Sequence, residues 1–167
     1  MELKEAIRKR RSIRRYVKGA PLAEEDLKGI LEAAMMAPSA RNGRPWEFVV
    51  VESEEKKREV VAHHPYCRHL LDAAVGIVVT VPGGYDRVAR EFTPQDAGAA
   101  IENLMLEALD RGYGTCWCGI YPDPARSAEI AKVIGTDRIP IGIVTLGKAD
   151  EEPAARGYYD EKKVKRI

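Results

Sequence analysis

Eight of the 27 lysine and arginine residues lie between Lys4 and Lys18, although the formal net charge of the 167-residue chain is only +1. Residues 8–15 read Arg-Lys-Arg-Arg-Ser-Ile-Arg-Arg, so that a hydroxyl, Ser12, stands inside the basic cluster. Guanidinium groups and a neutral hydroxyl together suit an oxyanion, and each charge-assisted hydrogen bond contributes roughly 1.5–3 kcal/mol. The cluster therefore suggests a phosphate ligand, but by itself it leaves open a solvated arm or a nucleic-acid patch.

A second candidate for ligand binding is the loop of residues 37–46, Ala-Pro-Ser-Ala-Arg-Asn-Gly-Arg-Pro-Trp. Its two prolines stiffen the backbone, and its serine and asparagine offer donors to a planar polar ligand. The same residue types dominate ordinary connections between a helix and a strand. The loop becomes informative only when it is considered together with the basic cluster.

The spacing of cysteine and histidine argues against a metal site. Cys116 and Cys118 would face the same side of a strand, but they do not form a Cys-x-x-Cys knuckle and no second cysteine pair exists, so we expect buried thiols. A denser group lies in the first half of the chain and consists of His63, His64, Cys67 and His69. Because Pro65 interrupts the helix that would align them, we expect a surface loop there and no metal.

Two further patterns of enzyme sites are missing from the sequence. No Ser-His-Asp or Cys-His arrangement stands out. The nearest match to a Gly-x-Gly-x-x-Gly turn, residues 112–114, ends a helix and enters a strand, which is the reverse of the dinucleotide-binding context.

Composition predicts one globular domain over residues 1–167. The chain is 45% hydrophobic and 32% charged, and its length suffices to bury about 70% of the surface of the unfolded chain. Apolar runs such as residues 77–79 are far shorter than the roughly 20 residues of a membrane span, and the first residues carry no apolar signal segment. Three cysteines favour a reducing compartment, and a pI of about 7.7 argues against a dedicated nucleic-acid binder. We expect a cytoplasmic protein with no membrane or nucleic-acid partner.

The hydrophobic pattern alternates between helices and strands. Leucine and isoleucine spacing predicts a short first helix at residues 3–7 and a second helix that stops at Pro38. Another helix should open at Ser53, one should run from Thr93 as N-cap to Gly112, and one should lie between Asp123 and Gly135. Predicted strands cover residues 48–51, 75–81, 115–120 and 139–146, the first two of them central, and residues 148–167 look like an extended tail. These elements predict an α+β or α/β domain with one sheet between helical layers.

Taken together, the motifs resemble the FMN-dependent nitroreductase family. The resemblance rests on Arg10-Arg11-Ser12-Ile13-Arg14, on a Pro-Ser-x-x-Asn-x-x-Pro-Trp loop at residues 38–46, and on a Gly-x-Gly-x-x-Trp strand entry at residues 112–117. Their order, their spacing and the intervening Asn103 helix cover residues 8–156. The resemblance implies an α+β, three-layer fold with a mainly antiparallel sheet of four or five strands, and a homodimer whose C-terminal tail crosses to the partner.

The resemblance also assigns candidate FMN-binding residues. By position, Arg10, Arg11 and Ser12 look like phosphate and ribityl ligands, and Arg14 looks placed at the pyrimidine side of the flavin. Arg156 resembles a second phosphate ligand, although Ala154 and Ala155 stand where a further basic residue is common. From the partner subunit, the loop residues that would approach the flavin are Pro38, Ser39, Ala40 and Asn42. The ring would face Trp117, Cys118 and Gly119, with a backbone N–H near flavin N5.

The resemblance implies hydride transfer from NADH or NADPH through FMN to a nitroaromatic, quinone, enone or flavin acceptor by a ping-pong cycle. Candidates for the substrate entrance are Arg41, Arg44 and residues 82–85, for which solvated loop residues are the open alternative. Candidates for the pyrimidine edge are Tyr66, Arg68 and His69. Two alternatives stay open. One is a family relative with different flavin chemistry, such as flavin fragmentation or ring oxidation, and the other is a nucleic-acid-binding module that uses the basic N-terminal segment.

Overall fold

The computed structural model describes residues 1–83 and 87–167, without the side chains of residues 87–90. Its four strands form one sheet in the order β1-β2-β4-β3, and each neighbouring pair is antiparallel. The strands are β1 (Glu47–Val51), β2 (Val75–Val81), β3 (Gly114–Gly119) and β4 (Ile139–Gly147). An isolated parallel bridge joins Ser12 to Thr115 at the outer edge of β3. The expected α+β fold with a mainly antiparallel sheet is confirmed.

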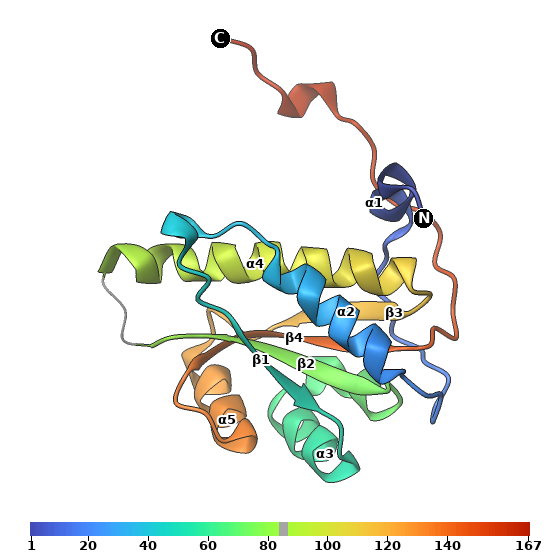
Figure 1. Cartoon of the computed structure of the whole chain (residues 1–167), viewed down its shortest axis with the longest axis vertical. Coiled ribbons are helices and arrows are strands. Elements are labelled where there is room, and N and C mark those ends of the chain that lie inside the picture. Colours follow the sequence, from blue (N-terminus) through green and yellow to red (C-terminus); the bar gives the residue numbers. More distant parts are fainter. Residues whose placement is uncertain (84–86) are drawn as a thin grey trace.

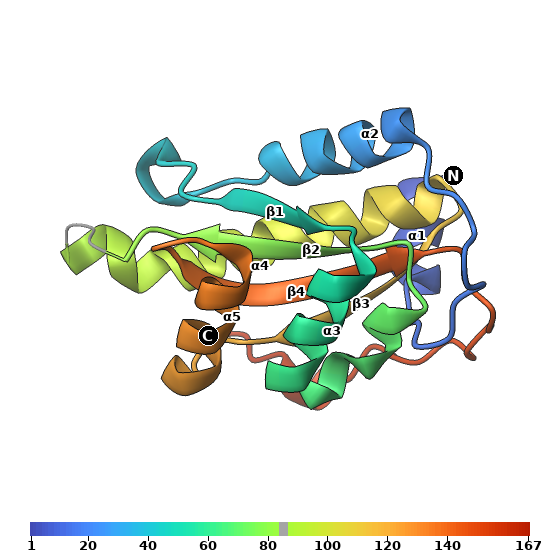
Figure 2. The ribbon, with the colours of Figure 1, turned by 90° about the horizontal axis from the view of Figure 1, so that it is seen from below.

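Helices cover both faces of the sheet (Figures 1 and 2). The α-helices are α1 (Leu3–Lys9), α2 (Glu24–Met35), α3 (Glu54–His63), α4 (Arg87–Asp110) and α5 (Pro124–Ile134). The 3-10 turns are η1 (Ala40–Asn42), η2 (Pro65–Leu71) and η3 (Glu161–Lys163). One core cluster packs α2 and α4 against the sheet, and a second packs α3, η2 and α5 against the opposite face. Because β2 lies between these clusters, all seven of its residues are buried, which explains a sequence that is apolar except for Thr80.

Several predicted helix ends are confirmed by their capping contacts. The Ser53 side chain accepts a hydrogen bond from the backbone N–H of Lys56, and Asp123 accepts one from Arg126. Gly135 ends α5 in the left-handed region, with φ of 69°, where a glycine avoids the steric cost of a Cβ. The start of α3 and both ends of α5 therefore follow from local sequence signals.

Three expectations about the elements were wrong. Helix α4 begins at Arg87 rather than at Thr93, and Pro94 lies inside it. The carboxylate of Asp96, expected to belong to a helix cap, instead accepts a hydrogen bond from the backbone N–H of Ala40 at 3.0 Å. Strand β1, expected to be central, is an edge strand, because β2 is its one neighbour in the sheet order. The segment around Pro65, expected to be a surface loop, is the turn η2, which is anchored by buried Cys67 and Leu70.

The basic N-terminal segment and the start of the C-terminal tail run side by side. Backbone hydrogen bonds join Val17 N–H to Lys148 O and Asp150 N–H to Arg15 O, each at 2.9 Å. The last part of the tail, which includes η3, extends away from the body of the molecule (Figure 1). Among the described residues, no helix combines the length and the apolar composition that crossing a bilayer requires.

Candidate functional site

The basic N-terminal segment is fastened along the open edge of β3. The backbone N–H of Ile13 donates to Thr115 O at 2.8 Å, beside the Ser12–Thr115 bridge. The buried Tyr16 hydroxyl then joins Ile13 O at 2.8 Å and the Thr145 hydroxyl at 2.7 Å. Burial raises the pKa of Tyr16, so its hydroxyl stays protonated at physiological pH and can donate. These contacts fix the backbone from which the arginines project.

The start of the tail returns alongside this segment and closes a cavity over it. The Arg11 Nε donates to Ala154 O at 3.2 Å, and an Arg15 guanidinium nitrogen donates to Asp150 O at 3.0 Å. The resulting cavity has a volume of about 460 Å³. It is lined by Arg10, Arg11, Ser12, Arg14, Glu151, Pro153, Ala154 and Arg156. The five residues expected at the phosphate and pyrimidine side, Arg156 included, thus line one cavity, although residues 14 and 156 are far apart in the sequence.

The cavity is strongly basic. Four arginines face one carboxylate, Glu151, which accepts hydrogen bonds from the backbone N–H groups of Arg14 and Arg15. Glu151 is therefore occupied with the backbone of the basic segment, and Arg10 Nε lies 3.1 Å from Glu102 outside the lining. The excess of positive charge and the Ser12 hydroxyl make the cavity a suitable receptor for a phosphate group.

The second predicted part of the site lies further along β3. Side chains alternate along a strand, so Trp117 points to the α4 face, where its Nε1 would lie 2.4 Å from a Cβ added to Gly142. Cys118 points to the opposite face and is 7% exposed. The missing side chain of Gly142 thus makes room for the half-exposed indole, a requirement that sequence reasoning missed.

Strand pairing shows which backbone amide faces the open edge. Thr115 directs its carbonyl to Ile13, away from β4. In an antiparallel strand every second residue points its backbone N–H and C=O to the same side, so residues with the parity of Thr115 also face away from β4. Gly119 shares this parity, and its carbonyl accepts a contact from His64 Nε2 at 3.0 Å, whereas Cys118 pairs inward with Ile143. Of the three residues expected at the ring, Trp117 and Gly119 therefore have amides at the open edge, and Cys118 does not.

His64 is a residue that sequence reasoning placed in a surface loop. Its side chain is buried, with Nε2 against Gly119 O, and its Nδ1 has no partner among the described atoms. Burial, and then the nearby Arg126 guanidinium, lower the pKa of His64. A neutral imidazole protonated at Nε2 satisfies this geometry and holds the end of β3 in place.

The loop of Pro38, Ser39, Ala40 and Asn42 lies elsewhere in this chain. It sits against the part of α4 that contains Asp96, and none of the four residues lines the basic cavity. Three non-glycine residues have left-handed backbone angles, with φ of 55° at Arg41, 53° at Asn42 and 47° at Arg44. Such strain, held here by Ser39 Oγ accepting from Arg44 N–H at 2.9 Å, is concentrated at functional segments of proteins. Gly84 and Tyr85, expected at a substrate entrance, lie outside the described residues.

His69 of η2 lies beside Cys116 and Cys118 of β3. The Cys118 Sγ lies 3.6 Å from His69 Nε2, and Cys67, Cys116 and Cys118 are all free thiols. Cys116 has a lowered pKa, first because Cys118 donates a hydrogen bond to it and also because His69 and Arg14 stabilise a thiolate. The pKa of Cys118 is raised, because its proton is held by Cys116 and its side chain is buried. Burial raises the pKa of Cys67 to about 12.

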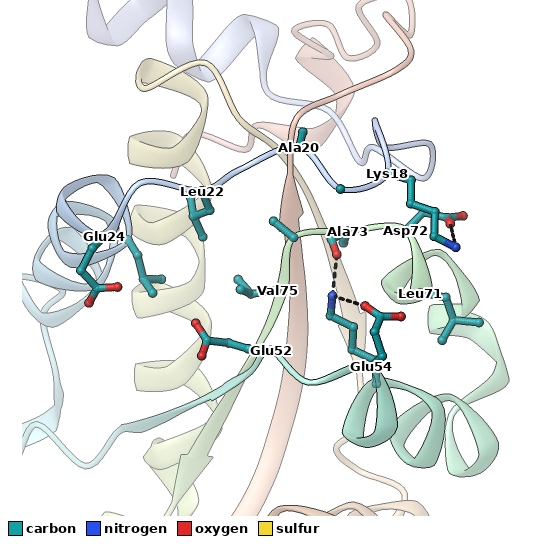
Figure 3. A pocket seen from close by; sticks show the side chains of 14 residues that line it. Lys18, Ala20, Leu22, Glu24, Glu52, Glu54, Leu71, Asp72, Ala73 and Val75 are labelled. Atoms are coloured by element: carbon teal, nitrogen blue, oxygen red, sulfur yellow. Dashed lines mark hydrogen bonds and ion pairs between the residues drawn. The ribbon is translucent and has the colours of Figure 1, made fainter.

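Another hollow, of about 250 Å³, lies between the segment before α2 and the start of α3 (Figure 3). Its buried Lys57 donates to Glu54 at 3.1 Å and to Ala73 O at 2.9 Å. A buried amine that is paired in this way ties α3 to the start of β2. The lining residues include none of the residues predicted for the cofactor. This hollow is best explained as a structural junction.

Comparison with known proteins identifies the family of this chain. The family model described as "Nitroreductase family" matches residues 7–65 and 59–148, so this chain belongs to the nitroreductase family. It is 35% identical over 166 residues, 98% of this chain and 86% of the other, to a protein of Methanothermobacter thermautotrophicus provisionally named NADH dehydrogenase/NAD(P)H nitroreductase.

Two solved structures have the same fold. An FMN-dependent nitroreductase from Clostridium difficile is 28% identical, with a TM-score of 0.88 over 98% of each chain. A provisionally named nitroreductase from Desulfovibrio desulfuricans, crystallised in complex with FMN, is 26% identical, with a TM-score of 0.83 over 100% of this chain and 97% of that one.

Proposed function

We propose that this chain binds FMN and uses NADH or NADPH to reduce a small-molecule acceptor. The observation that carries the proposal is the convergence of Arg10, Arg11, Ser12, Arg14 and Arg156 in one cavity at the open edge of β3. Membership of the nitroreductase family supports it, as do relatives that are named as FMN-dependent or were crystallised with FMN.

The residues present fit a ligand with a phosphate at one end. Arg11, Ser12 and Arg156 supply charged and neutral donors to the phosphate, and Arg10 adds positive charge beside them. Thr115 and Gly119 are four residues apart on β3, so the edge between them is about 13 Å long. An elongated ligand can lie along this edge with its phosphate at the Thr115 end.

The ring end of the site would be set by the last residues of β3. Trp117, Cys118 and Gly119 would face the isoalloxazine ring, with the Gly119 N–H as donor to N5, because its amide faces outward and no side chain stands beside it. The atoms nearest to a Cβ added at Gly119 begin at 4.0 Å, so the backbone is open to a close ligand. Arg14 would stabilise negative charge at the pyrimidine side.

FMN, when bound, would supply a two-electron carrier for hydride from NADH or NADPH and for reduction of a nitroaromatic, quinone, enone or flavin acceptor in a separate half-reaction. This chain's residues would bind the phosphate, orient the ring and hold the Gly119 amide through His64. Because no nucleophile is needed, the missing catalytic triad is consistent with this chemistry.

We also propose a homodimer in which each site is built from two chains. The loop of Pro38, Ser39, Ala40 and Asn42 lies away from the basic cavity of its own chain, so it is available to a partner's site. Beyond Arg156, the last tail residue that lines the cavity, the tail leaves the body of the molecule and carries the exposed Tyr158 and Tyr159. Deleting residues 148–167 should abolish dimerisation or FMN retention, and a truncated protein that stays dimeric and yellow would contradict the proposed dimer.

Free thiols at all three cysteines suit a reducing, cytoplasmic setting.

The visible spectrum of the purified protein, followed by anaerobic addition of NADH or NADPH, tests the proposal. We expect flavin bands that bleach on addition of the reductant and return when an acceptor is added. A colourless protein that does not take up FMN would refute the cofactor assignment. Flavin bands that fail to bleach would refute hydride acceptance and favour the alternatives of flavin fragmentation or ring oxidation.

A further inference from the structure

Three side chains with metal-binding atoms converge beneath β3. His69 comes from η2, and Cys116 and Cys118 come from one face of β3. Their ligand atoms, one imidazole nitrogen and two sulfurs, all lie within 4.8 Å of one another. The spacing of the two cysteines gave no reason to expect this, because the third member is 47 residues earlier in the chain.

The surrounding structure holds the three side chains in place. Cys116 and Cys118 share a face because strand side chains alternate, and they pair with Thr145 and Ile143 of β4. The turn η2 is anchored in the core by Cys67 and Leu70, both fully buried. The His69 ring stacks on the Tyr16 ring, with centroids 6.2 Å apart and an interplanar angle of 26°. The imidazole therefore has an ordered orientation toward the thiols.

We propose that His69, Cys116 and Cys118 bind a soft divalent metal ion of the zinc type, with a fourth position open to water or another small ligand. Tetrahedral zinc with Zn–S of about 2.3 Å and Zn–N of about 2.0–2.1 Å places a sulfur and a nitrogen ligand about 3.6 Å apart. The Cys118 Sγ and His69 Nε2 are 3.6 Å apart in this structure. The pair thus already has the separation of one edge of the coordination tetrahedron.

Charge and surroundings favour the same class of ion. Two thiolates balance a divalent cation, so the loaded site would be neutral, as a mostly apolar pocket requires. Cys116 and Cys118 are 2% and 7% exposed, and the neighbouring core residues include Ile13, Ile120 and Ile143. Sulfur and imidazole ligands select zinc-like ions over magnesium or calcium, which prefer oxygen.

The metal site shares Cys118 with the residues proposed to face the flavin ring, and His69 is also a candidate for the pyrimidine edge, but the donor proposed for N5 belongs to a different residue. Its ligands from β3 are the side chains of Cys116 and Cys118, whereas the proposed flavin donor is the outward backbone N–H of Gly119. Metal binding can therefore be tested independently of flavin chemistry. A negative metal result would leave the flavin spectrum as it is, and a colourless protein could still bind metal.

The experiment measures metal binding by the full-length protein, purified without oxidation, in its FMN-loaded and FMN-free forms. Zinc is added, unbound metal is removed by gel filtration, and bound zinc is measured by mass spectrometry. Cobalt is used as a second probe, because its d–d bands report tetrahedral coordination and its near-ultraviolet charge-transfer bands grow with the number of thiolate ligands. We expect one metal per chain in at least one form, with tetrahedral cobalt bands.

Matched variants locate the site. Cys116→Ser, Cys118→Ser and His69→Gln should each weaken zinc binding at least tenfold, whereas Cys67→Ser, which removes the third buried thiol, should leave it unchanged. Circular dichroism checks the fold of each variant, and the cobalt spectrum of the unmutated protein gives a result that does not depend on any variant folding. The proposal is overturned if both forms of the unmutated protein bind no zinc, if bound cobalt is octahedral, or if Cys67→Ser weakens binding as much as Cys118→Ser.

Discussion

Arg11 offers the sharpest test of the phosphate site, because Arg15 provides a matched control. Both guanidinium groups donate to a backbone carbonyl of the tail, Arg11 to Ala154 at 3.2 Å and Arg15 to Asp150 at 3.0 Å. Of the two, Arg11 lines the basic cavity and Arg15 does not. Replacing each by alanine therefore removes a similar tail contact and one positive charge, but the Arg11 change alone removes a phosphate donor.

The expected magnitude follows from the half-buried position of Arg11. A charge-assisted hydrogen bond contributes roughly 1.5–3 kcal/mol, so we take a loss of about 2 kcal/mol, which corresponds to FMN binding about 30-fold weaker. Arg11→Lys should give an intermediate loss, because an ammonium keeps the charge but lacks the planar fork. Arg15→Ala should change FMN affinity less than threefold, a difference below about 0.7 kcal/mol.

The assay is titration of flavin-free protein with FMN and, in parallel, with riboflavin, which lacks the phosphate. If Arg11 binds the phosphate, Arg11→Ala should weaken FMN binding and leave riboflavin binding nearly unchanged. Equal losses for both ligands would mean that Arg11 acts through the tail or the fold. An equal effect of Arg15→Ala on FMN would refute the reasoning as well.

Three further changes test the fold around the site. Gly76→Ala should lower the free energy of unfolding by about 1–3 kcal/mol in urea denaturation, because the added Cβ would lie 2.8 Å from Leu70 Cδ1 and 2.9 Å from Ile143 Cδ1; an unchanged midpoint would contradict this packing. Tyr16→Phe should cost about 1–3 kcal/mol and weaken FMN binding, because its hydroxyl secures the basic segment, and unaltered flavin affinity would show that the segment is held without it. The lowered pKa of His64 means that the unfolded chain takes up a proton at higher pH than the folded chain, so the free energy of unfolding should fall as the pH drops below the ordinary histidine pKa of about 6.5. In His64→Gln this part of the pH dependence should disappear, and parallel curves of stability against pH for the two proteins would count against it.

Much of the fold could be predicted from the sequence because its signals are local. The apolar run of β2, the capping residues Ser53 and Asp123 and the terminating Gly135 act within a few residues of themselves. The start of α4 could not be predicted in the same way. Asp96 resembles a helix-capping residue, but its carboxylate binds the backbone of Ala40, which only the folded chain brings near.

In the candidate site, too, the sequence predicted the local features but not the contacts between distant segments. Residue types and order within the motifs identified the basic segment, the Pro38 loop, the β3 residues and Arg156 as belonging to one family pattern. They did not show that Glu151 would occupy the backbone amides of the basic segment, or that strand parity would turn Gly119 rather than Cys118 outward. These features depend on pairing between segments that are distant in sequence.

The sequence by itself determined which chemical groups are present: a local excess of arginine able to bind phosphate, a stiff polar loop, and a pair of cysteines on one face of a strand. The tertiary structure decided which of them meet. It laid the tail beside the N-terminal segment, so that Arg156 joined Arg11, and it placed His69 over Cys116 and Cys118. The physical reason is that side-chain chemistry is carried by each residue, whereas proximity depends on the burial and hydrogen bonding of the whole chain.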